Sequence, residues 1–158
     1  MNNNFVKKYH YNTPIGNLWI AEKQNKIYKI SFFDIIEGDT CETTLIKETF
    51  HQLNEYFNKK RQIFDVPLLL EGTDFQLKVW KELMKIPYGQ TASYKDIATS
   101  IGNPKACRAV GLANNKNKII IIIPCHRIIG SNGQLTGFAG GLNTKKYLLN
   151  LEKKLMNL

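Results

Sequence analysis

The sequence SYKDIATSIGNPKACRAVGLA, at residues 93–113, predicts two short helices in succession. Ser93 has the spacing of a helix cap, and Gly102-Asn103 ends the first helix. Pro104 suits the first turn of a second helix, which runs to about Ala113. Two short helices joined by a turn that contains glycine are typical of a helix-turn-helix, and we predict one here.

The second helix carries small residues and one arginine that could face DNA. Arg108 would project into a groove, and the small side chains would let the helix backbone approach closely. These small residues are Ala106, Ala109, Gly111 and Ala113. The same small face would also suit helix packing inside the core. The sequence leaves both interpretations open and does not identify the groove.

The half of the chain around this motif carries the entire positive excess. The formal net charge is +9. Residues 1–72 contain nine basic and nine acidic side chains, whereas residues 73–158 contain thirteen basic and four acidic ones. This asymmetry favours a polyanion as the partner of the second half, although a lysine-rich solubilising surface would have the same charge.

The first half of the chain follows a different pattern, with strands before a helix. Three short runs rich in strand-forming residues come first: Tyr9–Tyr11, Asn17–Ala21 and Lys26–Phe33. Leu45–Phe57 then has apolar residues at helical spacing. In the second half, Thr73 and Gln76 have the spacing of a capping box. We therefore predict an α/β (α+β) protein with a supporting domain at residues 1–72 and a mostly helical DNA-binding domain at residues 73–158.

The candidate for covalent chemistry follows a run of isoleucines. Ile119–Ile123 predicts a strand buried on both faces, which Pro124 would end. Cys125-His126-Arg127 come next. Histidine and arginine neighbours lower the pKa of a thiol and favour the thiolate, so Cys125 is the candidate nucleophile. A buried, inert cysteine is the alternative.

Glu152 is a candidate partner for this thiol site, because it is the only carboxylate after residue 96 and lies among leucines. An acid in apolar surroundings normally has a partner. We expect that partner to be His126, which would accept the proton of Cys125 directly or through water. An exposed Glu152 paired with the lysine at position 145 or 146 is the alternative.

Several protein classes are excluded by the composition. Three widely spaced cysteines, Cys41, Cys107 and Cys125, are unsuited to a disulfide framework or to a CxxC-type zinc site. Ile119–Ile123 is the longest clean aliphatic run, far short of the roughly 20 residues that span a bilayer. The N-terminus lacks the apolar stretch of a secretory signal. We expect a cytoplasmic protein with no membrane association.

The segment Pro124-Cys125-His126-Arg127-Ile128-Ile129 resembles the methylated-DNA–protein-cysteine methyltransferases, also called O6-alkylguanine-DNA alkyltransferases. Further matching motifs occur in order: Gly72-Thr73-Asp74-Phe75-Gln76, Val79-Trp80, Ile86-Pro87-Tyr88-Gly89, Ser93-Tyr94, Gly102-Asn103-Pro104, Arg108-Ala109-Val110-Gly111, Asn117, Gly137-Phe138-Ala139-Gly140-Gly141-Leu142, Lys145, Leu148-Leu149 and Leu151-Glu152. The resemblance covers essentially all of residues 72–152. It extends more weakly to Tyr11-Asn12-Thr13-Pro14-Ile15-Gly16.

This resemblance implies a fold and a reaction. The fold would be a ribonuclease H-like N-terminal domain followed by a winged helix-turn-helix domain. The reaction would move the alkyl group from O6 of guanine, and from O4 of thymine, irreversibly to Cys125, in a single turnover and without a cofactor. His126 would be the base, Glu152 would orient it, and Asn117 would hold the adjacent turn.

The resemblance also implies how damaged DNA would be bound. Arg108 would enter the base stack from the minor groove while the damaged nucleotide rotates out, and Tyr94 would assist this rotation. The expected DNA contacts are Tyr94, Ala106, Arg108, Ala109, Gly111, Ala113 and Arg127. The expected pocket for the alkylated base is lined by Ile128, Phe138 and Ala139. The partner would be double-stranded DNA containing O6-alkylguanine, bound by a monomer in a nucleoid or nucleus.

The chain departs from the family pattern at a few positions. Lys118 stands where proline is common, and Ala139 stands where some members have serine. Some members bind zinc in the N-terminal domain, but here only Cys41, His10 and His51 are available, too few for a four-ligand site. We therefore predict no metal. Two other functions remain possible: a winged-helix lesion sensor with an idle thiol, and a cysteine hydrolase.

Overall fold

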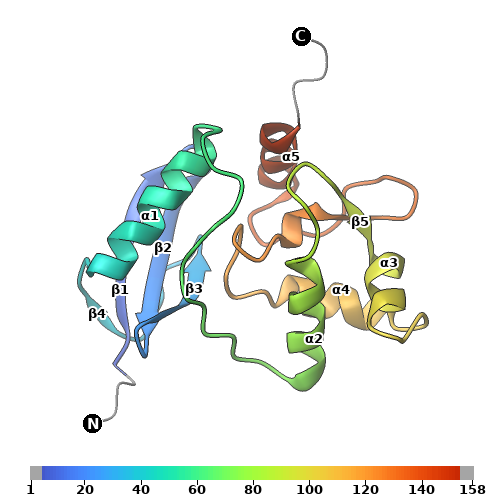
Figure 1. The fold of residues 1–158 in the computed structure, drawn as a ribbon, viewed down its shortest axis with the longest axis horizontal. Helices are drawn as coiled ribbons and strands as arrows, with labels where there is room; N and C mark the ends of the chain where they lie inside the picture. Colours follow the sequence, from blue (N-terminus) through green and yellow to red (C-terminus); the bar gives the residue numbers. More distant parts are fainter. Residues whose placement is uncertain (1–4, 154–158) are drawn as a thin grey trace. The chain divides into compact units, whose positions relative to one another are not determined.

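The computed structural model describes residues 5–153 and divides the chain into two compact units (Figure 1). The first unit contains the residues up to Glu71 together with Lys118–Ile120. The second contains Gly72–Asn117 and the residues from Ile121 onward. The first unit has the larger sheet and the second is mostly helical, which confirms the predicted mixed fold class. The return of Lys118–Ile120 to the first unit has no signal in the sequence.

The first unit is a four-stranded sheet with one helix. The strands are β1 (Lys7–Thr13), β2 (Gly16–Lys23), β3 (Lys26–Ser31) and β4 (Asp39–Thr40), in the order β3-β2-β1-β4. Strands β1, β2 and β3 pair antiparallel, and β4 runs parallel to β1. The short connections between the antiparallel strands need unusual backbone angles, because Gly16, Gln24 and Asn25 all have positive φ.

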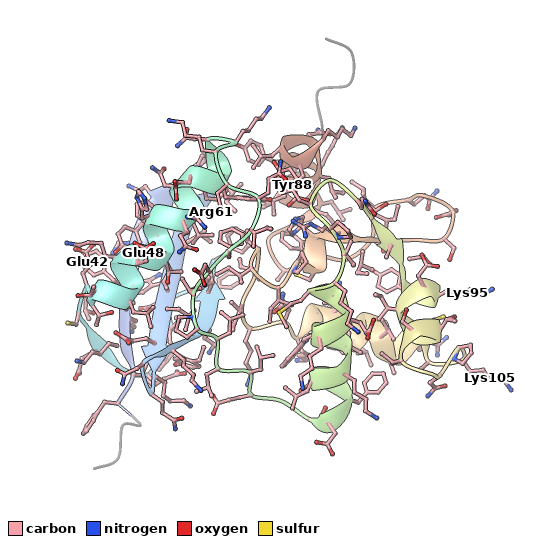
Figure 2. The ribbon with its side chains drawn as sticks, viewed as in Figure 1. Glu42, Glu48, Arg61, Tyr88, Lys95 and Lys105 are labelled. Atoms are coloured by element: carbon pink, nitrogen blue, oxygen red, sulfur yellow. The ribbon has the colours of Figure 1, made fainter. Side chains whose placement is uncertain are left out.

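Helix α1 (Thr44–Phe57) packs against the sheet of the first unit. The Thr43 side chain caps the helix by accepting a hydrogen bond from the Ile46 amide. Ile46, Leu53 and Tyr56 are buried on its inner side, whereas Glu48 lies on its exposed side (Figure 2). The predicted helix at residues 45–57 is therefore confirmed.

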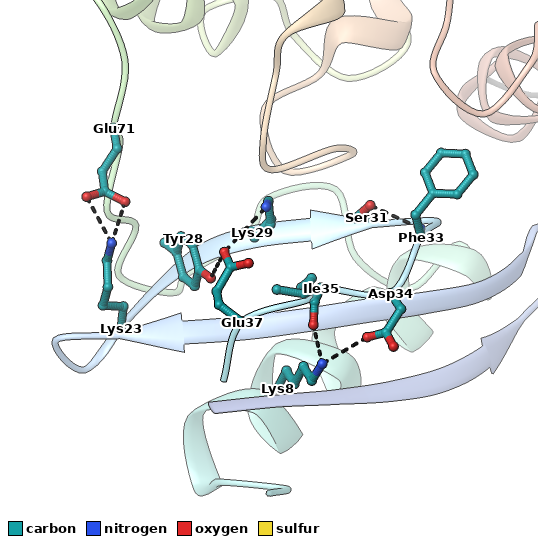
Figure 3. Close-up of polar contacts among 10 residues, drawn as sticks. All are labelled: Lys8, Lys23, Tyr28, Lys29, Ser31, Phe33, Asp34, Ile35, Glu37 and Glu71. Atoms are coloured by element: carbon teal, nitrogen blue, oxygen red, sulfur yellow. Dashed lines mark hydrogen bonds and ion pairs between the residues drawn. The ribbon is translucent and has the colours of Figure 1, made fainter. Parts of the chain in front are cut away.

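Polar contacts hold the segment after β3 in place (Figure 3). The Lys8 ammonium donates hydrogen bonds to the Asp34 carboxylate, at 3.0 Å, and to the Ile35 carbonyl. The Tyr28 hydroxyl donates to Glu37 at 2.9 Å. Ile35 itself is buried with Tyr28. These contacts complete the core of the first unit and involve none of the candidate catalytic residues.

Four helices form most of the second unit: α2 (Asp74–Leu83), α3 (Tyr94–Ser100), α4 (Cys107–Asn115) and α5 (Leu142–Glu152). Two-residue strands β5 (Ala92–Ser93) and β6 (Ile128–Ile129) pair in parallel. The predicted capping box of Thr73 and Gln76 is present, and the predicted cap at Ser93 also forms a capping box, with Asp96. None of the helices within residues 5–153 is long and apolar enough to cross a membrane.

Helices α3 and α4 pack together as the predicted helix-turn-helix. The turn between them includes Gly102, which has a φ of 81°. The second helix begins at Cys107, three residues after the predicted start at Pro104. The reason is a separate turn before the helix, in which the Ala106 amide donates to the Asn103 carbonyl at 3.0 Å.

The prediction of a continuous strand at Ile119–Ile123 is wrong. Ile119 forms a single bridge to Ile30, and the chain then turns at Ile121, whose φ is 73°. This left-handed conformation costs about 1–3 kcal/mol for a β-branched residue. The isoleucines at positions 119, 120, 121 and 123 are buried, so the apolar run correctly indicated burial but not an extended backbone.

Candidate active site

The turn that follows the isoleucines presents the candidate nucleophile. Cys125–Arg127 form one turn of 3-10 helix, in which the Arg127 amide donates to the Pro124 carbonyl at 3.0 Å. The Asn117 side chain donates to the Ile123 carbonyl at 2.7 Å, and the Asn114 side chain donates to the Cys125 carbonyl at 3.4 Å. The predicted role of Asn117 in holding the adjacent turn is consistent with this contact.

A buried carboxylate holds the histidine of this turn. Glu152 lies at the end of α5, and its Oε2 atom is 2.6 Å from Nε2 of His126. His126 has no exposed surface, and Glu152 is 1% exposed. The structure therefore brings together the predicted pair, and the alternative of an exposed Glu152 bound to a lysine is wrong.

Arg127 binds the other side of the same carboxylate. Its Nε atom donates to Oε1 of Glu152 at 2.8 Å, and Nη2 donates to Oε2 at 3.1 Å. A third hydrogen bond joins Nη1 to the Ile86 carbonyl at 2.7 Å, and the guanidinium lies over the ring of Tyr88. Arg127 is 7% exposed. Its predicted role as a DNA contact is therefore wrong, because the guanidinium is used inside the protein.

The charges of this cluster follow from its contacts. Burial alone would raise the pKa of Glu152, but hydrogen bonds from His126 and Arg127, together with their charges, outweigh burial and lower that pKa to about 2. Burial lowers the pKa of His126, and the adjacent carboxylate offsets this only in part. At neutral pH the cluster therefore consists of an ionised Glu152, an arginine cation and a neutral imidazole.

The contact with Glu152 also fixes the tautomer of His126. A carboxylate only accepts hydrogen bonds, so Nε2 of the neutral ring must carry the proton. The lone pair then lies on Nδ1, which has no hydrogen-bond partner among residues 5–153. His126 therefore has a free basic nitrogen, as a general base requires.

The thiol of Cys125 differs from the prediction. The side chain is 4% exposed, and burial raises its pKa to about 11, although a hydrogen bond from Asn117 and the charge of Lys145 lower it in part. The sequence neighbours were expected to lower this pKa. The two side chains do not, because Arg127 is directed to Glu152 and the imidazole of His126 is neutral; only the backbone of His126 lowers the pKa of the thiol in part.

Lys145 is a functional candidate to which the sequence analysis gave no role, although it belongs to one of the matching motifs. It lies on the inner side of α5 with no exposed surface, and its ammonium donates to the Thr136 carbonyl at 2.7 Å. Burial lowers the pKa of Lys145 to about 8, and the charge of Cys125 acts in the opposite direction. Its spacing from Glu152, seven residues along the same helix, was the available signal, because residues seven apart lie on one helix face.

Tyr94 is connected to Lys145 through one residue. The Tyr94 hydroxyl lies 2.8 Å from the Thr136 hydroxyl, and the Thr136 carbonyl accepts the hydrogen bond from Lys145. Tyr94 begins α3, so this connection joins the helix-turn-helix to the surroundings of the thiol. The sequence did not indicate Thr136.

The expected pocket residues differ in exposure. Ile128 has no exposed surface, Phe138 is half-buried, and Ala139 is exposed. Ile128 therefore cannot contact a base in this conformation. A cavity of about 300 Å³ does lie in the second unit, but it is lined by none of the three: its wall includes Ile129, Leu135, Leu149 and Glu152.

The expected DNA-facing residues also separate into two groups. Arg108 and Ala109 are exposed, and Ala106 and Gly111 are half-buried. Ala113 is 3% exposed, and its carbonyl accepts a hydrogen bond from the Trp80 indole at 2.9 Å. The assignment of Ala113 to the groove-facing surface is therefore wrong, because this residue packs against α2. Lys95 and Lys105 extend outward near α3 and α4 (Figure 2).

Metal-binding groups do not cluster in the described part of the chain. Residues 5–153 contain no group of three or more histidine, cysteine, aspartate or glutamate side chains that could hold a metal ion.

Comparison with known proteins identifies the family. Two family models match: "6-O-methylguanine DNA methyltransferase, ribonuclease-like domain" at residues 6–70, and "6-O-methylguanine DNA methyltransferase, DNA binding domain" at residues 74–154. The chain belongs to the 6-O-methylguanine DNA methyltransferase family. Its members include enzymes named methylated-DNA–protein-cysteine methyltransferases, so the resemblance seen in the sequence is confirmed.

Relatives of this family align with nearly the whole chain. The Methanosarcina barkeri methylated-DNA–protein-cysteine methyltransferase is 50% identical over 147 residues, covering 89% of this chain and 93% of the relative. The constitutive enzyme of Bacillus subtilis is 46% identical over 151 residues, covering 89% and 92%. A crystal structure of Mycobacterium tuberculosis OGT in complex with DNA has a TM-score of 0.86 and 45% identity, covering 93% of this chain and 92% of that chain.

Replacing Glu152 by glutamine should destabilise the protein by about 3–5 kcal/mol at neutral pH, because Arg127 would be left buried without a counter-charge. The ordinary pKa of a glutamate is 4.5, and that of Glu152 is about 2. The stabilisation from ionised Glu152 is therefore present above pH 4.5 and is lost as the pH falls towards 2. Urea unfolding across this range should show the difference between wild type and Glu152→Gln shrinking in acid.

Glu82→Gln is the matched control, because Glu82 forms an exposed ion pair with Lys85. Its loss should cost less than about 1 kcal/mol. A Glu152→Gln variant as stable as Glu82→Gln at neutral pH would contradict the assignment of the buried cluster.

The raised pKa of Cys125 predicts a strong pH dependence of its reaction with iodoacetamide. The thiolate is the reactive form, so the rate should rise about tenfold per pH unit from about pH 7 to pH 9. Peptide mapping by mass spectrometry would follow this cysteine separately from Cys41 and Cys107. A rate that is constant between about pH 6 and pH 8 would show that the thiol is already ionised.

Proposed function

We propose that this protein repairs O6-alkylguanine in DNA by transferring the alkyl group irreversibly to Cys125, and that O4-alkylthymine is a further substrate. The observation that carries the proposal is the arrangement of Cys125, His126 and Glu152, with Nδ1 of His126 left free to accept a proton. The DNA complex of the related M. tuberculosis protein supports DNA as the partner.

The reaction would begin with the transfer of a proton. Cys125 would lose it, directly or through one water, to Nδ1 of His126, and the carboxylate of Glu152 would stabilise the imidazolium that forms. The sulfur then attacks the alkyl carbon, so that a carbon–sulfur bond forms and the bond from carbon to O6 breaks. The electron pair stays on guanine, which takes up the proton that the His126 imidazolium releases, directly or through water. The thioether has no good leaving group, and each protein molecule would act once.

The raised pKa of the thiol places deprotonation within this reaction rather than before it. In the free protein a neutral thiol is the favoured form, since a buried thiolate is poorly solvated. Lys145 would offset this cost, because its buried ammonium acts on the charge that develops on sulfur. The Lys145 ammonium and the His126 imidazole would thus both favour formation of the thiolate.

The duplex would be bound through the helix-turn-helix in the minor groove. Arg108 would fill the space of the damaged nucleotide, and Tyr94 would contact the rotated base. This rotation is required because the reacting atom lies inside the duplex, and it costs a few kcal/mol. The positive excess of the second half supplies attraction to phosphates. Binding as a monomer and a cytoplasmic, nucleoid-associated location belong to the same proposal.

Incubation with an oligonucleotide containing O6-methylguanine should add a single methyl group to the protein. Intact mass measurement would detect it, and peptide mapping should place it on Cys125. The matched control is Cys125→Ser, which should gain no methyl group under the same conditions. Unmethylated protein would refute the proposal: retained lesion binding by Cys125→Ala would then favour a lesion sensor, and repeated turnover of an ester would favour a hydrolase.

Replacing Arg108 by alanine should slow repair in duplex DNA by more than tenfold and leave reaction with free O6-benzylguanine nearly unchanged, because a free base needs no rotation out of a duplex. Lys105→Ala is the matched control, since Lys105 is an exposed cation just before the same helix. Rates would be measured from the fraction of methylated or benzylated protein over time. Equal losses on both substrates would contradict the proposed role of Arg108.

A further inference from the structure

Helix α4 exposes one large apolar side chain, with a cation on either side of it along the chain. Leu112 is 63% exposed, whereas Val110 and Ala113 of the same helix are buried. Leu112 follows Arg108 by four residues, so both lie on one face of α4, and Lys116, four residues further on, caps the end of this helix. Both cations are exposed. The face is therefore apolar at its centre and positively charged at both ends.

The charges around Leu112 restrict what could cover it. The sequence contains no aspartate or glutamate between Asp96 and Glu152, so α4 and the segments on either side of it carry no negative charge. A second copy presenting the same face would bring cations against cations. A polyanion with an apolar surface between its phosphates has the complementary character.

We propose that Leu112 packs against the deoxyribose walls of the DNA minor groove, between the Arg108 side chain and a phosphate bound by Lys116. This inference rests on the proposed function and adds an apolar contact to it. The helix rises about 1.5 Å per residue, which places Arg108 and Lys116 roughly 12 Å apart along the axis. The deoxyribose is the same at every nucleotide, so the contact raises affinity for undamaged and damaged duplex alike.

The contact can be separated from phosphate binding by its salt dependence. Phosphate contacts release counterions and steepen the fall of affinity with salt, whereas an apolar contact leaves the slope unchanged. Fluorescence anisotropy with an undamaged duplex would give the dissociation constant at several salt concentrations for wild type, Leu112→Ala and Lys116→Ala. Leu112→Met serves as a control that keeps the apolar volume.

The proposal predicts that Leu112→Ala weakens binding about threefold to tenfold at every salt concentration, with the slope of wild type. Lys116→Ala should instead reduce the slope by about one, and Leu112→Met should bind nearly as wild type does. Thermal unfolding should be unchanged in all three, since both side chains are exposed. Binding by Leu112→Ala equal to that of wild type, or an altered slope, would overturn the inference.

The same proteins distinguish this inference from the proposed function. Methyl transfer by wild type together with unaltered binding by Leu112→Ala would remove the Leu112 contact alone. Absence of methyl transfer in wild type would remove the proposed function, whatever the binding data. A concentration-dependent dimer in size-exclusion chromatography that Leu112→Ala abolishes would assign this face to a second copy, and would overturn the inference.

Discussion

The ion cluster around Glu152 is the constraint on which the active site depends. One carboxylate, almost completely removed from water, accepts hydrogen bonds from His126 and from two nitrogens of Arg127. Burying this charge is tolerable only because both partners are present. The cluster joins the end of α5 to the turn that contains Cys125, and through the third hydrogen bond of Arg127 it also reaches the Ile86 carbonyl. Three segments distant in the sequence are thereby held together around the thiol.

The same cluster explains why the thiol is not activated in advance. Arg127 neutralises Glu152 and is unavailable to Cys125, and the neutral imidazole offers a lone pair instead of a charge. A protonated, buried thiol reacts poorly with the small electrophiles that a cell contains. Under the proposed single-turnover reaction, this would protect the cysteine until a base occupies the site.

Local signals predicted the parts of this structure that local interactions determine. The capping boxes at Thr73 and Ser93 and the helix-turn-helix follow from neighbouring residues, and Glu152 was found because an acid among leucines needs a partner. The wrong predictions concern the direction that a side chain or the backbone takes in the tertiary structure. The Cys125-His126-Arg127 sequence does not show which way the guanidinium points, and β-branched residues do not show that Ile121 turns. Lys145 was given no role because its function depends on its burial and on the charge of Cys125, and Thr136 was missed because its contacts with Tyr94 and Lys145 are tertiary.

The short segment Lys118–Ile120 has a consequence for how the chain can be divided. The Ile30 amide donates to the Lys118 carbonyl at 2.8 Å, so part of the first unit's backbone pairing is supplied by residues from the middle of the second half. The polypeptide therefore crosses between the units three times. A fragment that ends at Glu71 would lack the backbone partner of Ile30 at one edge of its sheet. A first unit separated from the second half of the chain would need another segment in place of Lys118–Ile120.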